Sequence, residues 1–239
     1  MPVFRWSEIP NQPIEPEYSA ATGRVYRGQR IEVARLTLPA GSSVRPHADP
    51  HEQVHTILAG KAEYRVGGEE RVVGAGDVVL IGPHTTCAAQ ILESLEVVVF
   101  KDRLAPAVRD DSAPPQAFYN WDRMSADFIT PRYSSAHGPT LTGARIEVSR
   151  MLLPTATEGK PHKHPNEQIQ VVLHGEARAM IGGEEEIVDS AGGVLFPPDV
   201  LHGAKIIRDY LVLNCKDIVA GWSVYQARWE SGQSPGAPV

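Results

Sequence analysis

The chain has 239 residues, 42% hydrophobic and 22% charged, and its net charge of −6 comes without any Lys or Arg cluster, which argues against nucleic acid or an anionic membrane as partner. Its apolar runs stay well short of the roughly 18 residues that a membrane-spanning helix needs, so a globular protein in water is expected. The two cysteines are too few for a disulfide framework, and residues 1–11 lack the basic start and apolar core of a signal peptide, which predicts a cytoplasmic location.

The first half of the chain is a series of short segments rich in Val, Ile and Leu and separated by Gly and Pro. This pattern predicts strands of about five to seven residues. The segments lie at 31–39, 54–60, 62–66, 70–82 and 95–100. Gly67-Gly68 stands between two of them, where glycine supplies the positive φ of a two-residue hairpin turn. Helical periodicity is hard to find, so an all-β fold is expected.

Residues 109–116 combine charge, Ser and paired prolines, and proline there fixes φ and withholds a backbone donor. We interpret this segment as a linker. After it, the second half repeats the first with one offset of 115 residues and no gap, so that Trp6 falls on Trp121 and Lys101-Asp102 on Lys216-Asp217. The sequence therefore predicts two tandem antiparallel barrels or sandwiches, at residues 1–108 and 117–239.

The tail from Ile218 carries Trp222, Tyr225, Arg228 and Trp229 at spacings that suit one face of a short helix. Packing of this segment across a barrel is the favoured interpretation. The last residues, 232–239, are expected to be disordered.

The segment from His162 holds the candidate chemistry. Side chains two apart on a strand point to the same face, so His162, His164, Gln168 and Gln170 are expected to face one way. Neutral imidazoles bind first-row divalent metals well, and an amide oxygen is a weaker, hard ligand. With His202 arriving from a neighbouring strand, the sequence predicts a metal site formed by His162, His164, Gln168 and His202. Gln170 is a candidate for hydrogen bonding to a substrate or for support of the ligands.

The first copy departs from this set, because Asp49 and Cys87 stand where the second has His164 and His202. His47, His51, Gln53 and His55 share one face of their predicted strand, so a second, distorted metal site formed from these residues and Asp49 is an open alternative. An empty barrel is favoured, with Cys87 as a small buried apolar residue. Glu52 and Glu167 alternate away from the ligand face and are expected to be structural, and Arg178 and Lys205 are expected to be solvated charges.

The two motifs of the second copy resemble those of the cupin superfamily, over nearly the whole chain and in both halves. The first cupin motif reads G-x5-H-x-H-x3,4-E-x6-G and the second G-x5-P-x-G-x2-H. Gln168 and Gly175 keep the spacing of the first motif, and Pro197 precedes His202 by the expected five residues. Gln168 replaces the usual glutamate, as in bicupins with a glutamine ligand, and Ala191 replaces a glycine of the second motif. The resemblance implies a bicupin made of two jelly-roll (double-stranded β-helix) barrels.

The resemblance also implies a metal-dependent enzyme, as a monomer or a homodimer. Because three histidines and a glutamine are neutral, a divalent ion would keep its +2 charge and attract a small anionic substrate such as an α-keto acid or enolate. Isomerase, tautomerase or lyase chemistry is the first hypothesis. An Fe(II) dioxygenase and a non-catalytic module that binds a sugar or acid are the alternatives. The metal is one of Fe, Mn, Co, Ni or Zn.

Overall fold

A computed structural model describes residues 2–103, 116–131 and 133–220 of the chain. The described part is almost entirely β, as predicted, and its helical elements are two short 3-10 turns, η1 (Trp6–Glu8) and η3 (Trp121–Arg123). Of the predicted linker, residues 109–115 lie outside the described residues, and so does the tail from residue 221. In the part of the chain that the structure describes, no helix has the length and apolar character needed to cross a membrane.

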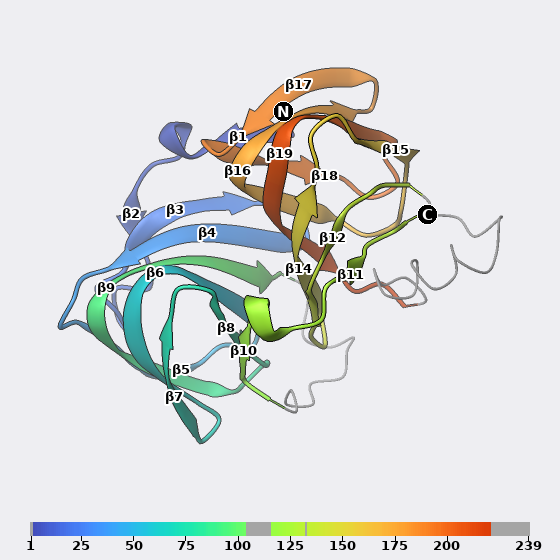
Figure 1. Cartoon of the computed structure of the whole chain (residues 1–239). Helices are drawn as coiled ribbons and strands as arrows, with labels where there is room; N and C mark the ends of the chain where they lie inside the picture. The colour runs from blue at the N-terminus through green and yellow to red at the C-terminus, as the bar shows by residue number, and fades with distance from the viewer. Residues whose placement is uncertain (1, 104–115, 132, 221–239) are drawn as a thin grey trace. The chain divides into compact units, whose positions relative to one another are not determined.

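The strands form two compact units, each built on one antiparallel sheet (Figure 1). The first barrel contains the described residues of 9–124 and 143–145. Its sheet has the order β10-β8-β6-β9-β4-β3-β2, with β5 paired to β9 and β7 paired to β6. Its strands are β2 (Gln12–Pro13), β3 (Thr22–Arg27), β4 (Ile31–Leu38), β5 (Ser43–Ala48), β6 (Gln53–Val66), β7 (Glu69–Gly74), β8 (Asp77–Ile81), β9 (Thr86–Asp102) and β10 (Phe118–Asn120).

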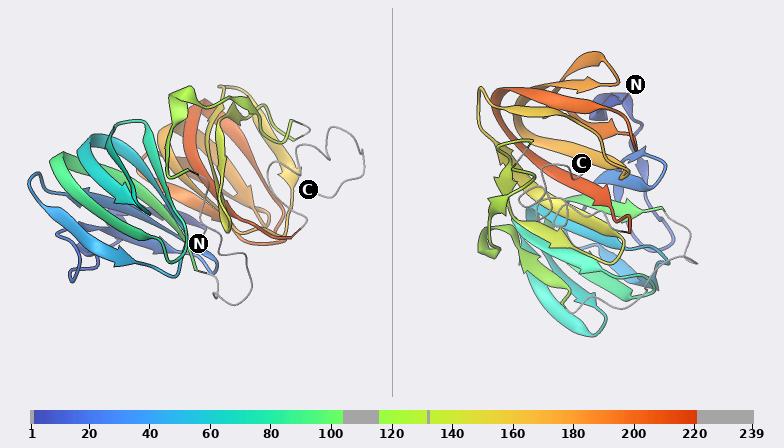
Figure 2. Two further views of the ribbon diagram at one scale, coloured as in Figure 1. Left: turned by 90° about the horizontal axis from the view of Figure 1, so that it is seen from below. Right: turned by 90° about the vertical axis from the view of Figure 1, so that its right-hand side faces the viewer.

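The second barrel repeats this arrangement with the order β1-β18-β16-β19-β14-β12-β11, with β13 paired to β14, β15 to β19 and β17 to β16. Its strands are β1 (Val3–Arg5), β11 (Asp127–Phe128), β12 (His137–Gly138), β13 (Thr140–Thr142), β14 (Ile146–Leu153), β15 (Glu158–His162), β16 (Gln168–Ile181), β17 (Glu184–Asp189), β18 (Gly192–Phe196) and β19 (His202–Asp217). Within each unit the strands curve into facing layers (Figure 2). The predicted pair of tandem jelly-roll barrels is confirmed.

Each barrel takes one short strand from the other half of the chain. β1 pairs with β18 of the second barrel, with Phe4 opposite Gly193, and β10 pairs with β8 of the first barrel, with Phe118 opposite Val79. The compact units therefore differ from the expected domain limits, which placed residues 1–8 in the first barrel and 117–124 in the second.

The central strands are longer than the predicted five to seven residues. The segments 54–60 and 62–66 were expected as separate strands, but both belong to the 14-residue β6, which continues through a bulge at Gly60. Gly60 has φ 83°, and a Cβ there would lie 2.1 Å from the Ser94 carbonyl oxygen. Only glycine allows this close approach, so it bends the strand instead of ending it. Gly175 does the same in β16.

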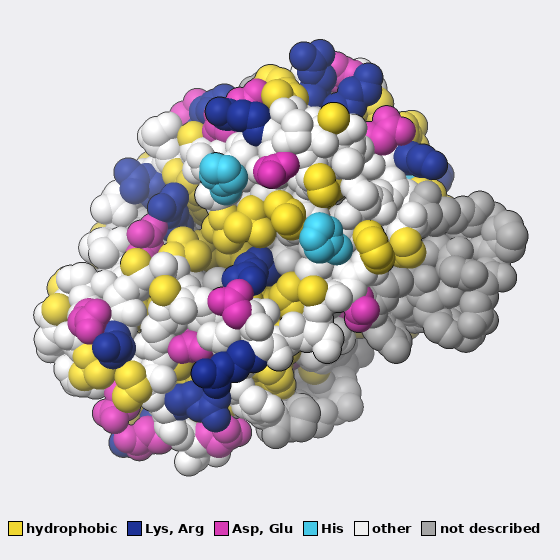
Figure 3. Space-filling model, viewed as in Figure 1, with side chains coloured by type: hydrophobic (Ala, Val, Ile, Leu, Met, Phe, Trp, Pro, Cys, Tyr) yellow, Lys and Arg dark blue, Asp and Glu magenta, His cyan; other side chains and the backbone are white. Residues whose placement is uncertain are grey.

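The predicted hairpin turns are present in both copies. Gly67-Gly68 joins β6 to β7 and Gly182-Gly183 joins β16 to β17, all with positive φ. The interior of each barrel is a single cluster of Val, Ile, Leu and aromatic side chains, and Cys87 belongs to the cluster of the first barrel, as expected for a small apolar residue. On the face seen in Figure 3, basic and acidic side chains are interspersed.

Candidate metal centre

Three histidines of the second barrel converge at one end of its interior. His162 ends β15 and is paired with His202, the first residue of β19, while His164 lies in the segment between β15 and β16. One ligand nitrogen from each of the three lies within 4.8 Å of the other two. Among the residues that the structure describes, this is the one group of three or more His, Cys, Asp or Glu side chains so arranged.

The backbone fixes the tautomer of each histidine. Nδ1 lies 2.7 Å from the Lys160 carbonyl oxygen in His162, 3.0 Å from that of Asn166 in His164, and 2.8 Å from that of Val200 in His202. A carbonyl oxygen only accepts hydrogen bonds, so Nδ1 carries the proton in each ring. Each Nε2 therefore presents a lone pair, as histidine ligands of metals do.

No hydrogen-bond donor of the described residues is found at the Nε2 atoms of these histidines. Nε2 of His202 is buried without a hydrogen-bond partner. Nε2 of His164 lies 3.0 Å from Oε1 of Gln168, so two lone-pair donors face each other. Buried acceptors are normally satisfied, and a cation between them satisfies both. The donor set fits a metal ion.

Burial keeps these imidazoles neutral. It lowers the pKa of His162 to about 4 and that of His202 to about 3, and it lowers the pKa of His164 still further. The positive charge of Lys216 acts in the same direction on all three. Because a histidine must be neutral to bind a metal, the three rings are ready for coordination at pH 7.

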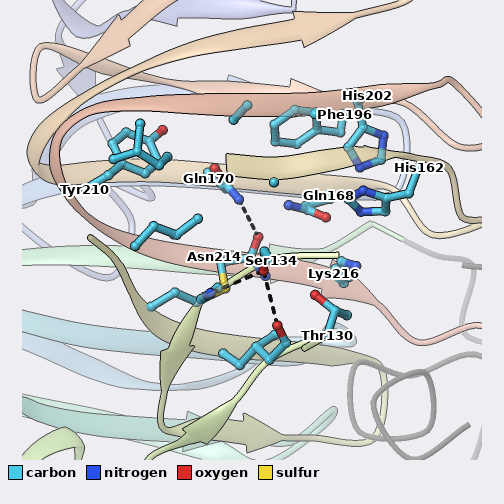
Figure 4. A pocket seen from close by; sticks show the side chains of 18 residues that line it. Thr130, Ser134, His162, Gln168, Gln170, Phe196, His202, Tyr210, Asn214 and Lys216 are labelled. Atoms are coloured by element: carbon cyan, nitrogen blue, oxygen red, sulfur yellow. Dashed lines mark hydrogen bonds between the residues drawn. The ribbon is translucent and has the colours of Figure 1, made fainter. Parts of the chain in front are cut away.

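The ligand segment is not the single strand that the sequence suggested. β15 ends at His162 and β16 begins at Gln168, with Pro165 in the intervening segment. Proline has no N–H to donate to a ladder, which is consistent with a break there. The four expected ligands nevertheless meet, because the break lets His164 reach Gln168. Gln170 faces the same pocket and donates to Oδ1 of Asn214 at 3.2 Å (Figure 4).

A cavity of about 70 Å³ is lined by two of the three histidines, His162 and His202. Sequence reasoning did not single out Lys216, Asn214 or Tyr210 among its lining residues, and the identity of Lys216 with Lys101 in the repeat gave no reason to do so. The Lys216 side chain is buried, and burial lowers its pKa to about 8 against the opposing effect of the Glu147 and Asp217 carboxylates. The pocket therefore combines one positive charge with neutral polar groups.

In the first barrel the equivalent side chains are engaged with one another. Nδ1 of His47 lies 2.8 Å from the Arg45 carbonyl oxygen, and its Nε2 is 3.7 Å from a Glu15 carboxylate oxygen. Asp49, at the position of His164, forms an ion pair with Lys101, which also lies 3.5 Å from Glu15. A lysine ammonium thus neutralises the carboxylate that a metal would need.

The other second-site candidates of the first barrel do not gather around a common point either. Nδ1 of His51 is 3.4 Å from Oδ1 of Asp102. His55 uses both ring nitrogens, with Gln53 Oε1 at 3.0 Å and the Tyr64 hydroxyl at 3.2 Å. The proposed second metal site therefore has no geometric support among the described residues.

The side chains expected to be structural or solvated lie as follows. The buried carboxylate of Glu52 accepts hydrogen bonds from the backbone N–H groups of Ala144 and Arg145, as suits a structural role. Glu167 is also buried, and its N–H donates to an Asp217 carboxylate oxygen at 2.6 Å. Arg178 is exposed and lies 3.5 Å from a Glu185 oxygen, and Lys205 is exposed on β19.

Asp199 holds the His164 segment in place from a strained backbone position. Its N–H donates to the His164 carbonyl oxygen at 2.8 Å, and its φ is 59°, where the second cupin motif has glycine. We expect Asp199→Gly to raise the free energy of unfolding by about 0.5–1 kcal/mol, because glycine adopts positive φ without a Cβ penalty. Denaturant unfolding measures this effect. Asp199→Ala is the control, because alanine keeps the Cβ atom and therefore the steric cost of positive φ. A lower free energy of unfolding in Asp199→Gly would contradict the interpretation that the backbone of Asp199 is strained.

Comparison with known proteins relates this fold to one family. The family described as "Cupin domain" matches residues 34–90 and 149–209, once in each barrel. A search of curated protein sequences gave no match.

Solved structures with two such barrels are similar over most of their length. AerE from Microcystis aeruginosa has a TM-score of 0.71 and 15% identity, covering 88% of this chain and 98% of that one. Protein YlbA from E. coli has a TM-score of 0.71 and 13% identity, covering 90% of each chain. A variant of oxalate decarboxylase from Bacillus subtilis has a TM-score of 0.68 and 12% identity, covering 91% of this chain and 77% of that one.

Proposed function

The chain is a bicupin of the cupin superfamily, and on this basis we propose that it is a metal-dependent enzyme whose C-terminal barrel acts on a small anionic carbonyl or enol substrate. The observation that carries the proposal is the grouping of one ring nitrogen from each of the three histidines within 4.8 Å of the others, with Oε1 of Gln168 3.0 Å from Nε2 of His164. His162, His164, Gln168 and His202 would hold one divalent transition metal. The metal would supply Lewis-acid polarisation of a carbonyl oxygen.

The position of the cavity favours an enzyme over a protein with a structural metal. Structural sites are closed by protein ligands, whereas catalytic sites keep a position open to substrate. Here His162, Gln168 and His202 themselves line the cavity, so a ligand in it touches the same side chains. Gln170, held by Asn214, would orient a substrate oxygen by donating its remaining N–H.

Non-redox chemistry next to a carbonyl is the reaction class we propose, as isomerase, tautomerase or lyase. The neutral ligand set supports this class because it leaves the full charge of the ion for the substrate. The similar oxalate decarboxylase of Bacillus subtilis is described as having Mn(II) centres, and decarboxylation is a lyase reaction on a small carboxylate. Oxygen uptake by the Fe(II)-loaded protein with substrate would instead assign it to the dioxygenases.

Elemental analysis of freshly purified protein tests the metal site directly. We expect about one equivalent of transition metal per chain, because one ligand set of the type that binds such ions is present among the described residues. Two equivalents per chain would indicate that the first barrel also binds a metal ion. A value near zero that persists after incubation with excess Fe, Mn, Co, Ni or Zn would overturn the enzyme proposal.

A further inference from the structure

Lys216 presents a buried ammonium group to the cavity of the second barrel. Its residue is 8% exposed, and it lines the cavity with Gln168 and His202 (Figure 4). Among the residues that the structure describes, its Nζ forms no hydrogen bond or ion pair, although the Glu147 and Asp217 carboxylates raise its pKa through space. A lysine this buried normally forms a direct ion pair, so the absence of one requires an explanation.

The first barrel shows what partner the fold can supply to this lysine. Lys101 is the equivalent of Lys216 in the repeat, and it is paired with the carboxylates of Asp49 and Glu15. The second barrel has His164 in place of Asp49 and Thr130 in place of Glu15. Thr130 has the same backbone conformation as Glu15, with a φ of 49° where Glu15 has 46°, and it also lines the cavity. Both carboxylates have therefore been replaced while the lysine remains.

Much of the remaining lining is apolar. Met151, Leu153 and Ile206 form part of the walls, and Phe196 packs against His202 with 4.6 Å between ring centroids. Tyr210 lies at the end opposite the histidines (Figure 4). Such a pocket takes an apolar group, with few polar contacts to fix its orientation.

We propose that Lys216 binds the carboxylate of the substrate, and that this substrate is a small α-keto or related carboxylic acid whose apolar side chain extends toward Tyr210. The inference rests on the proposed function, because it places the substrate in the same pocket. The substrate carboxylate takes the place that Glu15 and Asp49 occupy around Lys101 in the first barrel. The ammonium group gains a direct ion pair, which Glu147 and Asp217 do not form with it.

Calorimetric titration of the metal-free protein with α-ketoisocaproate tests this assignment without activity. We expect Lys216→Met to weaken binding at least about tenfold, because a charge-assisted hydrogen bond is lost. Lys205→Met, an exposed lysine on the same strand, is expected to bind like the wild type. Methyl isobutyl ketone, which lacks the carboxylate, should bind both lysine variants equally. Lys216→Gln repeats the test if the methionine variant does not fold.

A second pair of variants tests the effect of a carboxylate placed in the second barrel at the position that Glu15 has in the first. We expect Thr130→Glu to occupy Lys216 from within the protein and to weaken α-ketoisocaproate binding about tenfold, whereas Thr130→Gln, of equal size and no charge, weakens it less. Unchanged binding in Lys216→Met, or no binding by the wild type, overturns the assignment. The metal content of the freshly purified wild type is measured separately, before its metal is removed for the titration, so a wild type purified without metal refutes the proposed function and not the role of Lys216.

Discussion

Replacing His162 with alanine is expected to reduce bound metal from about one equivalent to below a tenth of an equivalent per chain, while the barrel stays folded. The ring contributes one of the three inward Nε2 atoms, and metal affinity depends strongly on ligand number. His162 is half-buried at the end of β15, so its truncation leaves little cavity behind. If the metal is catalytic, activity should fall roughly a thousandfold, because Lewis-acid stabilisation of several kcal/mol is lost.

His47 provides a matched control for this variant. It occupies the equivalent position in the first barrel, with the same half-burial and the same Nδ1 hydrogen bond to a carbonyl two residues earlier. His47→Ala should leave the metal content unchanged when both variants are compared by elemental analysis and circular dichroism. Full metal retention in His162→Ala would remove this residue from the ligand set. Unfolding of that variant would support a structural metal instead.

The sequence predicted the candidate metal ligands because the repeat and the motif together single them out. His164 and His202 differ from their counterparts Asp49 and Cys87 in the first copy, whereas His162 and Gln168 are the same in both, and the spacing of all four suits strands that meet at one end of a barrel. Lys216 escaped the same comparison because it is identical in both copies. Its significance lies in partners that come from distant segments, Glu15 and Asp49 in one barrel and Thr130 and His164 in the other.

The alternative of a second metal site in the first barrel stayed open in the sequence for a related reason. Alternation along a strand correctly placed Gln53 and His55 together, but it carried no information on which side chains their polar atoms would meet. His55 is satisfied by Gln53 and Tyr64, and Asp49 by Lys101. These hydrogen bonds and ion pairs depend on the tertiary fold, which periodicity does not describe.

The fold class followed from strand pattern, but the exchange of end strands did not. β1 and β10 have three residues each, and nothing local distinguishes a strand that pairs within its own half from one that pairs with the other half. The register with β18 depends on Gly192 and Gly193, where a Cβ would lie within 2.6 Å of Phe4 atoms. Such close approach is a property of two distant segments together.

We expect Phe4→Ala to lower the free energy of unfolding of the second barrel by about 3–5 kcal/mol, the usual cost of deleting a buried phenylalanine ring. Phe4 is 5% exposed and packs edge-on against Trp6, with 5.1 Å between ring centroids. Without the ring, β1 loses its apolar anchor and the edge of β18 loses its cover. Guanidinium unfolding followed by circular dichroism measures the change.

Arg5→Ala on the same strand is the control, because its side chain is 43% exposed and its ion pair with Asp189 spans 3.6 Å. A change within about 0.5 kcal/mol is expected for it. The proposed metal ligands belong to the barrel that β1 completes, so Phe4→Ala should also release metal at a lower denaturant concentration than Arg5→Ala does. A destabilisation below about 1 kcal/mol would contradict the burial that motivates it. β1 belongs to the first sequence repeat but pairs with the second barrel. A large destabilisation by Phe4→Ala would therefore mean that separating the two repeats removes a strand on which the stability of the second barrel depends.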